Sequence, residues 1–328
     1  MTVAAPRQPS LRPPAAAAVG MVALALLVVY LVWGSTYLAI RVVVHQAPPL
    51  LGMGTRYLTA AVLLGLLLAT RGGFRRLRVT RRELAGCAFL GLMLPVLGNG
   101  MVSVGEDHGA PSGVTALLIA VAPLMITIFR FAAGDRPRNL TWLGVLLGFT
   151  GLGYLVLTDR SGTGPVPLGA ALIVLFASTC WAFGSWSQPR LPLPADAFAM
   201  TVHEMWTGGA MLLVLGLLRG ERLDLPSYGA RTWVAWGYLV VFGSMVAFTA
   251  YVWLLAHAPI SLVATYAYVN PVVAVFLGAL VLGEPVTPAV LVGGAVIVAA
   301  VAIVITAERR PRAQPLPEAP GTVEQVRE

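Results

Sequence analysis

The amino-acid sequence predicts an all-α integral membrane protein of ten transmembrane helices, arranged as two inverted five-helix repeats. Three observations support this fold class: the composition of the chain, a series of long apolar segments, and a pattern that recurs after about 148 residues. The first two indicate a chain embedded in a lipid bilayer. The third determines how the two halves are oriented.

The composition excludes a soluble domain. Hydrophobic residues make up 58% of the chain, charged residues 11%, and the mean hydropathy is +0.81. Soluble domains carry roughly twice that share of charge. All 22 basic residues are arginine, and the sequence pI is about 10.1. We expect no nucleic-acid partner, because the arginine clusters lie at the ends of apolar segments, where positive charge sets membrane topology.

Ten segments are long and apolar enough to be membrane spans, since a helix needs about 20 apolar residues to cross about 30 Å of hydrocarbon. The first is longer than the apolar core of a signal peptide, so we expect an uncleaved span. Residues 1–19 and 307–328, rich in Pro, Arg and Glu, are predicted to be disordered tails. The predicted spans are residues 20–43, 50–70, 84–105, 112–133, 141–158, 168–188, 196–218, 232–255, 260–282 and 287–306.

The distribution of arginine predicts that both termini are cytoplasmic. With the N-terminus inside, the cytoplasmic side holds 15 arginines and the far side five. Basic residues accumulate on the cytoplasmic side of membrane proteins. The loop from Arg219 to Arg231 opposes this orientation, but it also carries Glu221 and Asp224 and is outweighed by the rest of the chain.

A shift of 148 residues aligns the two halves of the chain. Glycine and proline matches are the most informative, because they mark backbone positions rather than general apolarity. Each half holds five spans, an odd number, so the second half enters the membrane inverted relative to the first. Inverted repeats are a transporter architecture with the site near the midplane. We place the repeats at residues 20–158 and 159–306, with Ala110, Pro111, Ala116, Pro123 and Pro137 matching Ala258, Pro259, Ala264, Pro271 and Pro285.

Several motifs resemble the EamA-domain transporters of the drug/metabolite transporter superfamily, in particular the ten-span exporters with two such domains. The resemblance covers roughly residues 20–306 and implies a central cavity that opens alternately to either side. It is weakly specific for substrate, since similar motifs occur in exporters of amino acids, other metabolites and drugs. The motifs are Trp33-Gly34-Ser35-Thr36-Tyr37, Gly98-Asn99 with Glu106, Pro111-Ser112-Gly113, Thr265 to Val273, and Leu282-Gly283-Glu284-Pro285.

Aromatic and amide side chains within the spans are the candidates for binding substrate. Aromatic walls suit an amphipathic organic solute through stacking and cation–π contacts. Each tryptophan has an alternative role as an anchor at the membrane interface. The candidate substrate-binding residues are Tyr37, Asn99, Tyr266, Asn270, Trp33, Trp181 and Trp186.

Two ionisable residues lie well inside spans, where charge is costly and usually functional. Arg56 and Glu204 match under the 148-residue shift, so we expect an ion pair or positions on opposite sides of the cavity; snorkelling or a static structural pair is the alternative. Glu204, or its neighbour His203, is also a candidate for carrying a coupled proton. No metal site is expected, because the zinc motif His-Glu-x-x-His would need histidine where Thr207 stands.

Three prolines inside spans, Pro95, Pro123 and Pro271, are candidate gating kinks, since each removes a helical hydrogen bond. Pro123 and Pro271 are repeat mates, so kinks are expected at equivalent depth in both halves. A static kink stabilised by neighbouring helices is the alternative.

The charged cluster from Glu106 to His108 follows the third predicted span. It is either a solvated loop, or an outer gate or a group that attracts cations.

These features predict a secondary transporter that exports a small metabolite, amino acid or drug-like solute. A passive channel and a lipid flippase remain alternatives. An enzyme is not expected, because no catalytic motif is found. The P-loop motif needs lysine, which the chain lacks, so no nucleotide partner is expected. No cofactor is expected either. The expected partners are the small-molecule substrate and the bilayer, and the chain is either a monomer or a homodimer.

Overall fold

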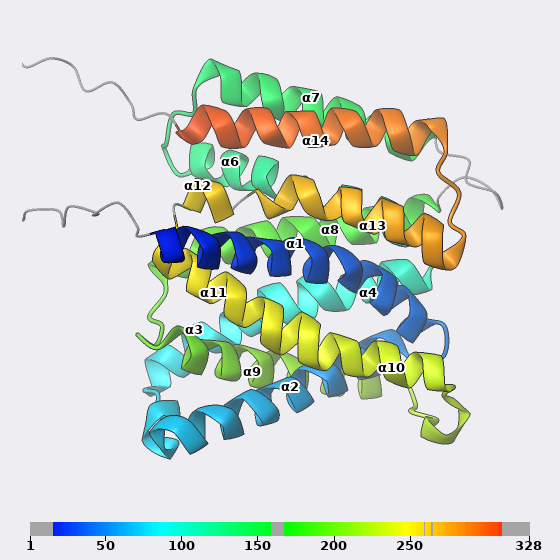
Figure 1. The fold of residues 1–328 in the computed structure, drawn as a ribbon. Coiled ribbons are helices and arrows are strands. Elements are labelled where there is room, and N and C mark those ends of the chain that lie inside the picture. Colours follow the sequence, from blue (N-terminus) through cyan, green and yellow to red (C-terminus); the bar gives the residue numbers. More distant parts are fainter. Residues whose placement is uncertain (1–15, 159–166, 259, 264, 310–328) are drawn as a thin grey trace, which may run out of the picture.

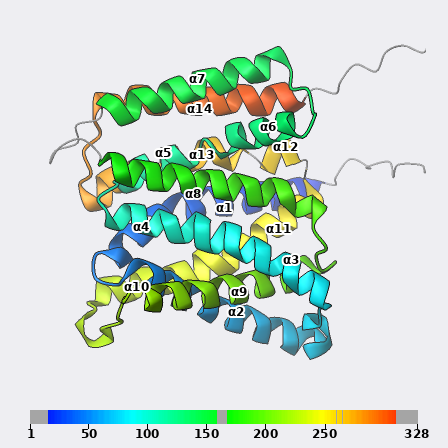
Figure 2. The ribbon, with the colours of Figure 1, turned by 180° about the vertical axis from the view of Figure 1, so that it is seen from behind.

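The computed structural model describes residues 16–158, 167–258, 260–263 and 265–309. Throughout these ranges the chain is helical, with short connections (Figures 1 and 2). The helices run side by side, and the start of the first and the end of the last lie at the same end of the bundle. We call this the terminal end and the other the distal end.

The first half contains five spans. Two of them are single helices at the start, and a third closes the half; the other two are composite. The elements are α1 (Ala16–Val44), α2 (Pro49–Gly72), α3 (Arg81–Gly91) continued by η2 (Leu92–Gly100) and α4 (Met101–Asp107), α5 (Ser112–Ile119) followed by α6 (Ala122–Ala132), and α7 (Asn139–Thr158).

The second half repeats this plan. Its third span is again composite, and its fourth is again divided into two helices. The elements are α8 (Leu168–Ser187), α9 (Ala197–Leu218), α10 (Ala230–Tyr238) continued by η5 (Leu239–Val246) and α11 (Ala247–His257), α12 (Ile260–Val263) followed by α13 (Tyr266–Leu282), and α14 (Pro288–Arg309).

The predicted spans correspond to these helices with ends that differ by a few residues. Nine of the described stretches are long and apolar enough to cross a membrane, and Tyr266–Leu282 is a shorter apolar helix of the ninth span. Helix α1 begins at Ala16 and α14 ends at Arg309, so both helices extend beyond the predicted span limits of residues 20 and 306. Some residues on which the predictions rest lie outside the described residues. Among the arginines counted for orientation these are Arg7, Arg12, Arg160, Arg310, Arg312 and Arg327, and in the repeat match they are Pro259 and Ala264. The rest of residues 1–15 and 310–328 also lie outside.

The third span of each half is interrupted at the same place. The segments η2 and η5 are stretches of π-helix, and the 148-residue shift places one on the other. Pro95 lies inside η2 and matches Gly243 in η5. Proline cannot donate the regular helical hydrogen bond, and π-helical stretches often occur at functional sites. The repeat therefore extends to irregular backbone as well as to helix order.

Glycines allow the closest helix contacts. Helices α2 and α9, which are repeat mates, pack along their length; a Cβ on Gly209 would lie 3.0 Å from the backbone nitrogen of Leu58. Helix α7 packs along α14 at one edge of the bundle (Figure 1). There a Cβ on Gly144 would lie 2.7 Å from Val304, so this glycine allows close contact between α7 and α14 within the bundle.

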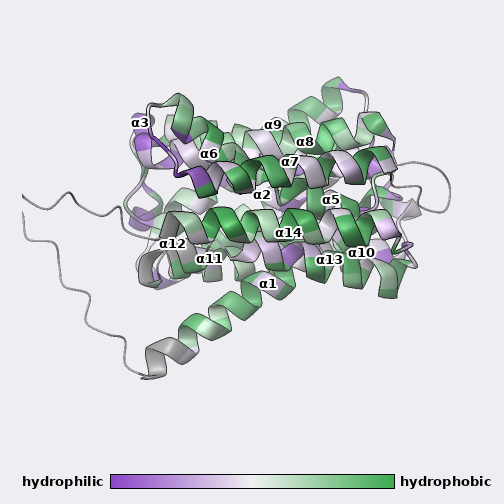
Figure 3. Cartoon of the chain, turned by 90° about the horizontal axis from the view of Figure 1, so that it is seen from above, coloured by the Kyte–Doolittle hydropathy of each residue, from purple (hydrophilic) through white to green (hydrophobic). Residues whose placement is uncertain are grey.

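The outer surface of the helices is apolar. Hydrophobic residues cover most of the helical lengths, and hydrophilic segments gather toward the ends, as at the start of α3 (Figure 3). Leu146 and Leu157 on α7 are among the exposed hydrophobic side chains, with exposures of 66% and 81%. Such a surface is stable in lipid rather than in water. The chain is therefore a multi-pass membrane protein.

Two of the sequence motifs contact each other at the distal end. After α13, Gly283 adopts a left-handed conformation with φ of 67°, and Glu284 follows it. The Glu284 carboxylate accepts hydrogen bonds from the backbone nitrogens of Ser112 (2.8 Å) and Gly113 (3.2 Å) and from the Ser112 hydroxyl (2.8 Å). A carboxylate at a helix N-terminus satisfies free amide groups. The motif around Glu284 thus caps α5 of the other half.

Candidate functional site

A central pocket lies between the two halves of the bundle. It encloses about 1000 Å³ of space free of protein atoms, including the part open to solvent, and eight of the ten spans contribute to its wall. The helices α7 and α14 do not contribute. Ligand sites in membrane transporters with inverted repeats lie at this position. Of the candidate residues, the pocket brings together Trp33, Tyr37, Arg56, Pro95, Asn99, Pro123, Trp181, Glu204, Tyr266, Asn270 and Pro271.

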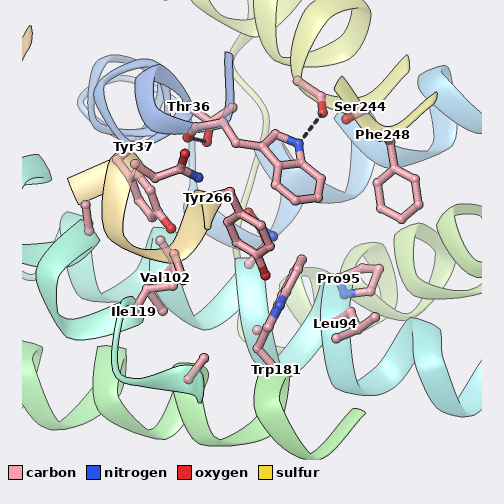
Figure 4. Close-up of a pocket in the computed structure, with 18 of the residues that line it drawn as sticks. Thr36, Tyr37, Leu94, Pro95, Val102, Ile119, Trp181, Ser244, Phe248 and Tyr266 are labelled. Carbon is pink, nitrogen blue, oxygen red and sulfur yellow. Dashed lines mark hydrogen bonds between the residues drawn. The ribbon is translucent and has the colours of Figure 1, made fainter. Parts of the chain in front are cut away.

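One wall of the pocket is aromatic. Trp33 lies edge-on to Tyr266, with ring centroids 5.4 Å apart, and packs against Phe248 at 6.1 Å. The Trp33 indole nitrogen donates to the Gly243 carbonyl in η5 at 3.3 Å (Figure 4). Figure 4 also shows the Tyr37, Tyr266 and Trp181 side chains converging on the same space. The rings are held by packing and by one backbone hydrogen bond, so the wall is preorganised for an aromatic or apolar group.

The two buried charges face the pocket from neighbouring helices. Arg56 on α2 is 4% exposed and Glu204 on α9 is 3% exposed. The Arg56 Nε donates to the Ser244 hydroxyl at 3.1 Å, and its guanidinium carbon lies 4.8 Å from the centre of the Tyr57 ring. Of the two expected arrangements, the ion pair between Arg56 and Glu204 is therefore absent among the described residues, and both side chains line the cavity.

The amide candidates differ in how they are held. Asn99 lies in η2 and lines the pocket. The amide nitrogen of Asn270, when oriented to donate, lies 3.2 Å from the Tyr266 carbonyl and 3.3 Å from the Tyr30 carbonyl. Asn270 therefore links α13 to α1 within the pocket wall.

Two candidate residues lie away from the pocket lining. Trp186, near the end of α8, stacks on Phe183 with centroids 5.8 Å apart, and the Arg190 guanidinium lies 4.1 Å from its ring. His203 Nε2 lies 2.9 Å from the Leu77 carbonyl, in the connection that follows α2. Both side chains point to helix neighbours rather than to the cavity. The sequence could not show this, because one helical position separates His203 from the pocket residue Glu204.

The prolines do not produce matched kinks. Pro123 stands in the first turn of α6, directly after the break that follows α5, whereas Pro271 lies inside α13. The carbonyl of Ile119, freed at the first break, accepts a hydrogen bond from Ser178 at 3.2 Å. In the second half the helix boundary precedes Tyr266, so the break falls about one turn earlier in the repeat register. The expectation of equivalent depth is therefore wrong.

Sequence reasoning missed several pocket residues. Ser244 and Phe248 come from the interrupted eighth span, and Tyr57 is the neighbour of Arg56. The sequence did contain a signal for Ser244. The repeat aligns its neighbour Gly243 with Pro95, which was already a candidate residue. Of the two interpretations of the cluster from Glu106 to His108, the solvated loop is wrong for Glu106 itself. It is 0% exposed in α4 and is not part of a solvated loop, although Asp107 and His108 after it are exposed.

In the described part of the chain, nine apolar spans and one shorter apolar helix form two inverted halves around a central pocket, as in a membrane transporter. Comparison of the sequence with protein families agrees. The profile of the EamA-like transporter family matches residues 20–157 and again 168–306. The chain belongs to this family. Since it is a family of transporters, the protein is not an enzyme.

Individual relatives match nearly the whole of the chain. The uncharacterized inner membrane transporter YedA of Escherichia coli K12 is 39% identical over 281 residues, covering 85% of this chain and 89% of YedA. A probable amino-acid metabolite efflux pump of Salmonella typhimurium is 26% identical, covering 84% of this chain and 91% of the pump. A crystal structure of a protein 20% identical to this chain has a TM-score of 0.61 and covers 88% of this chain and 98% of its own; it shows the fold alone.

Proposed function

We propose that the protein is a secondary carrier that exports a small amphipathic solute bearing both a cationic and an anionic group, such as an amino acid. The observation that carries this proposal is the composition of the pocket. Its wall combines a fixed guanidinium, Arg56, a buried carboxylate, Glu204, and the aromatic cluster around Trp33. A zwitterion would offer each charge an opposite partner, and its apolar part would contact the rings.

The inverted repeat supports alternating access as the mechanism. The pocket lies between two halves of opposite orientation, so rocking of one half against the other would expose it to each side in turn. The aligned interruptions η2 and η5 both border the pocket, through Pro95 and Gly243. Helices interrupted at the site are able to bend there during this motion.

We further propose that the protein resides in the inner, or plasma, membrane with both termini in the cytoplasm. The excess of arginine on the terminal side supports this orientation. The relative from Escherichia coli is named as an inner membrane transporter, and the relative from Salmonella as an efflux pump, which supports export as the direction. Reporter fusions after Arg309 and within the loop at Leu223 test the orientation: the first should be cytoplasmic and the second should not.

The function is tested by reconstituting the full chain in proteoliposomes. Amino acids and cationic drugs are screened as radiolabelled solutes, with and without a pH gradient. Saturable counterflow of a zwitterion supports the carrier. Saturable counterflow of cationic drugs alone would reject the zwitterion. Linear, non-saturating flux would identify a channel, and movement of labelled phospholipid without solute flux would identify a flippase.

A further inference from the structure

Glu106 is a buried carboxylate that the pocket does not use. It lies in the last turn of α4, at the distal end of the third span, and is 0% exposed. Within the described part of the chain, neither of its carboxylate oxygens has a hydrogen-bond partner. Burying an ionised carboxylate without a partner is very unfavourable, and such groups normally take up a proton instead. Each unsatisfied buried group of this kind calls for an explanation.

Glu106 stands one helical turn beyond the pocket toward the distal end. Val102 and Tyr37 line the pocket on α4 and α1, and the residues one turn further along these helices are Glu106 and Arg41. The Arg41 guanidinium donates to the main-chain carbonyl of Glu106, which links the two helices at this level. Arg41 and Glu106 therefore form a layer between the lining residues Tyr37 and Val102 and the distal end of the bundle.

Few ionisable groups surround this carboxyl group. Arg41 and Glu284 are the charged side chains whose fields act on Glu106, and the Tyr37 hydroxyl is influenced by it in turn. Helix α5 carries no ionisable residue, and η2 carries none. Helix α8 carries only Cys180, while α2 carries Arg56, Tyr57 and the remote Arg71. On its own helix, Asp107 and His108 follow Glu106 and are exposed.

The inverted repeat is broken at this position. The 148-residue shift places Glu106 on Leu254, at the corresponding depth toward the terminal end. Leu254 is also 0% exposed, but it packs with Leu26, Val29 and Val263 in an apolar cluster. The two positions related by the repeat thus differ in chemistry: the one toward the terminal end lies among hydrocarbon side chains, and the one toward the distal end carries a carboxyl group.

We propose that the layer of Arg41 and Glu106 is a gate at the distal end of the pocket, that Glu106 is its proton-binding site, and that protonation of Glu106 holds this distal gate closed. In the closed state the carboxyl group is neutral and buried behind Arg41. When the gate opens, water reaches the side chain, the O–H proton leaves to that water, and the carboxylate is solvated beside the Arg41 guanidinium. Low pH on the distal side therefore stabilises the closed gate, and higher pH favours opening.

The proton is the ligand that this site fits. A metal ion would need several protein oxygens or nitrogens around it. Among the described residues, no three His, Cys, Asp or Glu side chains gather to form such a cage. The gate chemistry adds a regulatory property to the proposed carrier without depending on which solute it carries.

The experiment measures access to the pocket from the distal side. In full-length protein carrying Cys87→Ser and Cys180→Ser, a single cysteine is introduced by Asn99→Cys in the pocket wall. The matched reference is Leu223→Cys, in an exposed loop at the distal end. A membrane-impermeant cationic methanethiosulfonate is applied from the side on which Leu223→Cys reacts. The ratio of the two rates is measured from pH 5.5 to pH 8, and the same ratio in the Glu106→Gln protein gives the contribution from titration of the two thiols themselves.

With Glu106 present, the ratio should rise with pH, by at most about tenfold per pH unit for one linked proton. Glu106→Gln and Glu106→Leu, which are permanently neutral, should give a low ratio that keeps only the pH dependence of the two thiols. Glu106→Asp should restore a pH dependence. The proposal is overturned if the parent ratio is independent of pH, or if Glu106→Gln or Glu106→Leu retains the parent's dependence. The cysteine-accessibility experiment needs no substrate. If counterflow cannot be measured for any solute, the proposed function is refuted, but the conclusion about Glu106 is unaffected.

Discussion

Arg56 of α2 and Glu204 of α9 occupy equivalent positions in the two halves and line one pocket, yet no ion pair joins them in the described part of the chain. Arg56 instead donates to Ser244 and lies beside Tyr57. Each charge therefore retains capacity to bind an oppositely charged group. Because α2 and α9 pack tightly, the two charges are presented on one pair of helices.

Removing either charge should weaken transport of a zwitterion. Hydrogen bonds to charged groups contribute about 1.5–3 kcal/mol, so Arg56→Gln and Glu204→Gln should each raise KM by roughly tenfold or more. His203→Gln is the matched control, because its side chain bonds to the Leu77 carbonyl and not to the pocket. Counterflow kinetics in proteoliposomes measure the effect. Normal transport by both charge variants would reject a role for these residues in binding.

Replacing the two tryptophans of α8 should have different effects on the KM for substrate. Trp181 lines the pocket, whereas Trp186 packs on Phe183 outside its lining. An aromatic contact contributes about 0.5–1.5 kcal/mol, so Trp181→Leu should raise KM by about two- to tenfold. Trp186→Leu should leave KM unchanged. Equal effects of the two changes on KM would contradict the assignment of Trp181 to the substrate wall.

Close packing of α2 on α9 should make Gly209 intolerant of a side chain. A Cβ there would lie 3.0 Å from the Leu58 nitrogen and 3.1 Å from the Gly54 carbonyl oxygen, both backbone atoms that cannot move away independently. Overpacking costs about 1–3 kcal/mol, so Gly209→Ala should lower the melting temperature in detergent. Gly153→Ala is the control, since nothing lies within 4 Å of its Cβ position. A Gly209→Ala protein as stable as the Gly153→Ala protein would show that the helices separate easily.

Asp196 should make part of the stability of the fold depend on pH in the acid range. It precedes α9, accepts from the backbone nitrogens of Phe198 (3.0 Å) and Ala199 (3.4 Å), and pairs with Arg76. Burial raises the pKa of Asp196, but the hydrogen bond from Arg76, the backbone bonds and the Arg76 charge lower it more, so the net pKa lies below its usual value. The resulting stabilisation is complete above the unfolded pKa of about 3.9 and is lost as the pH falls through the folded value.

Thermal unfolding at several pH values tests this linkage. Asp196→Asn should melt below the parent at pH 7, and the difference should shrink as the pH falls below about 4. Asp224→Asn, at an exposed position in the connection after α9, should match the parent throughout. A difference between parent and Asp196→Asn that is independent of pH would show that the carboxylate charge does not matter.

The sequence by itself determined the fold class, the ten spans and the inverted repeat, because these depend on hydropathy along the chain and on a fixed register. It also identified Arg56, Glu204 and most of the aromatic lining, since an ionisable or ring side chain inside a span is conspicuous. The repeat register placed Pro95 on Gly243, and the structure has π-helical stretches at both positions.

Only the tertiary structure decided which way each side chain points. Neighbouring residues of one helix face different partners, so His203 contacts the Leu77 carbonyl after α2 while Glu204 reaches the pocket. Packing likewise placed Trp186 on Phe183, and it buried Glu106 in a segment whose charges suggested a solvated loop. The direction of a helix face and the solvation of a charge depend on the helices packed around them. These contacts join residues far apart in sequence, and local pattern does not contain them.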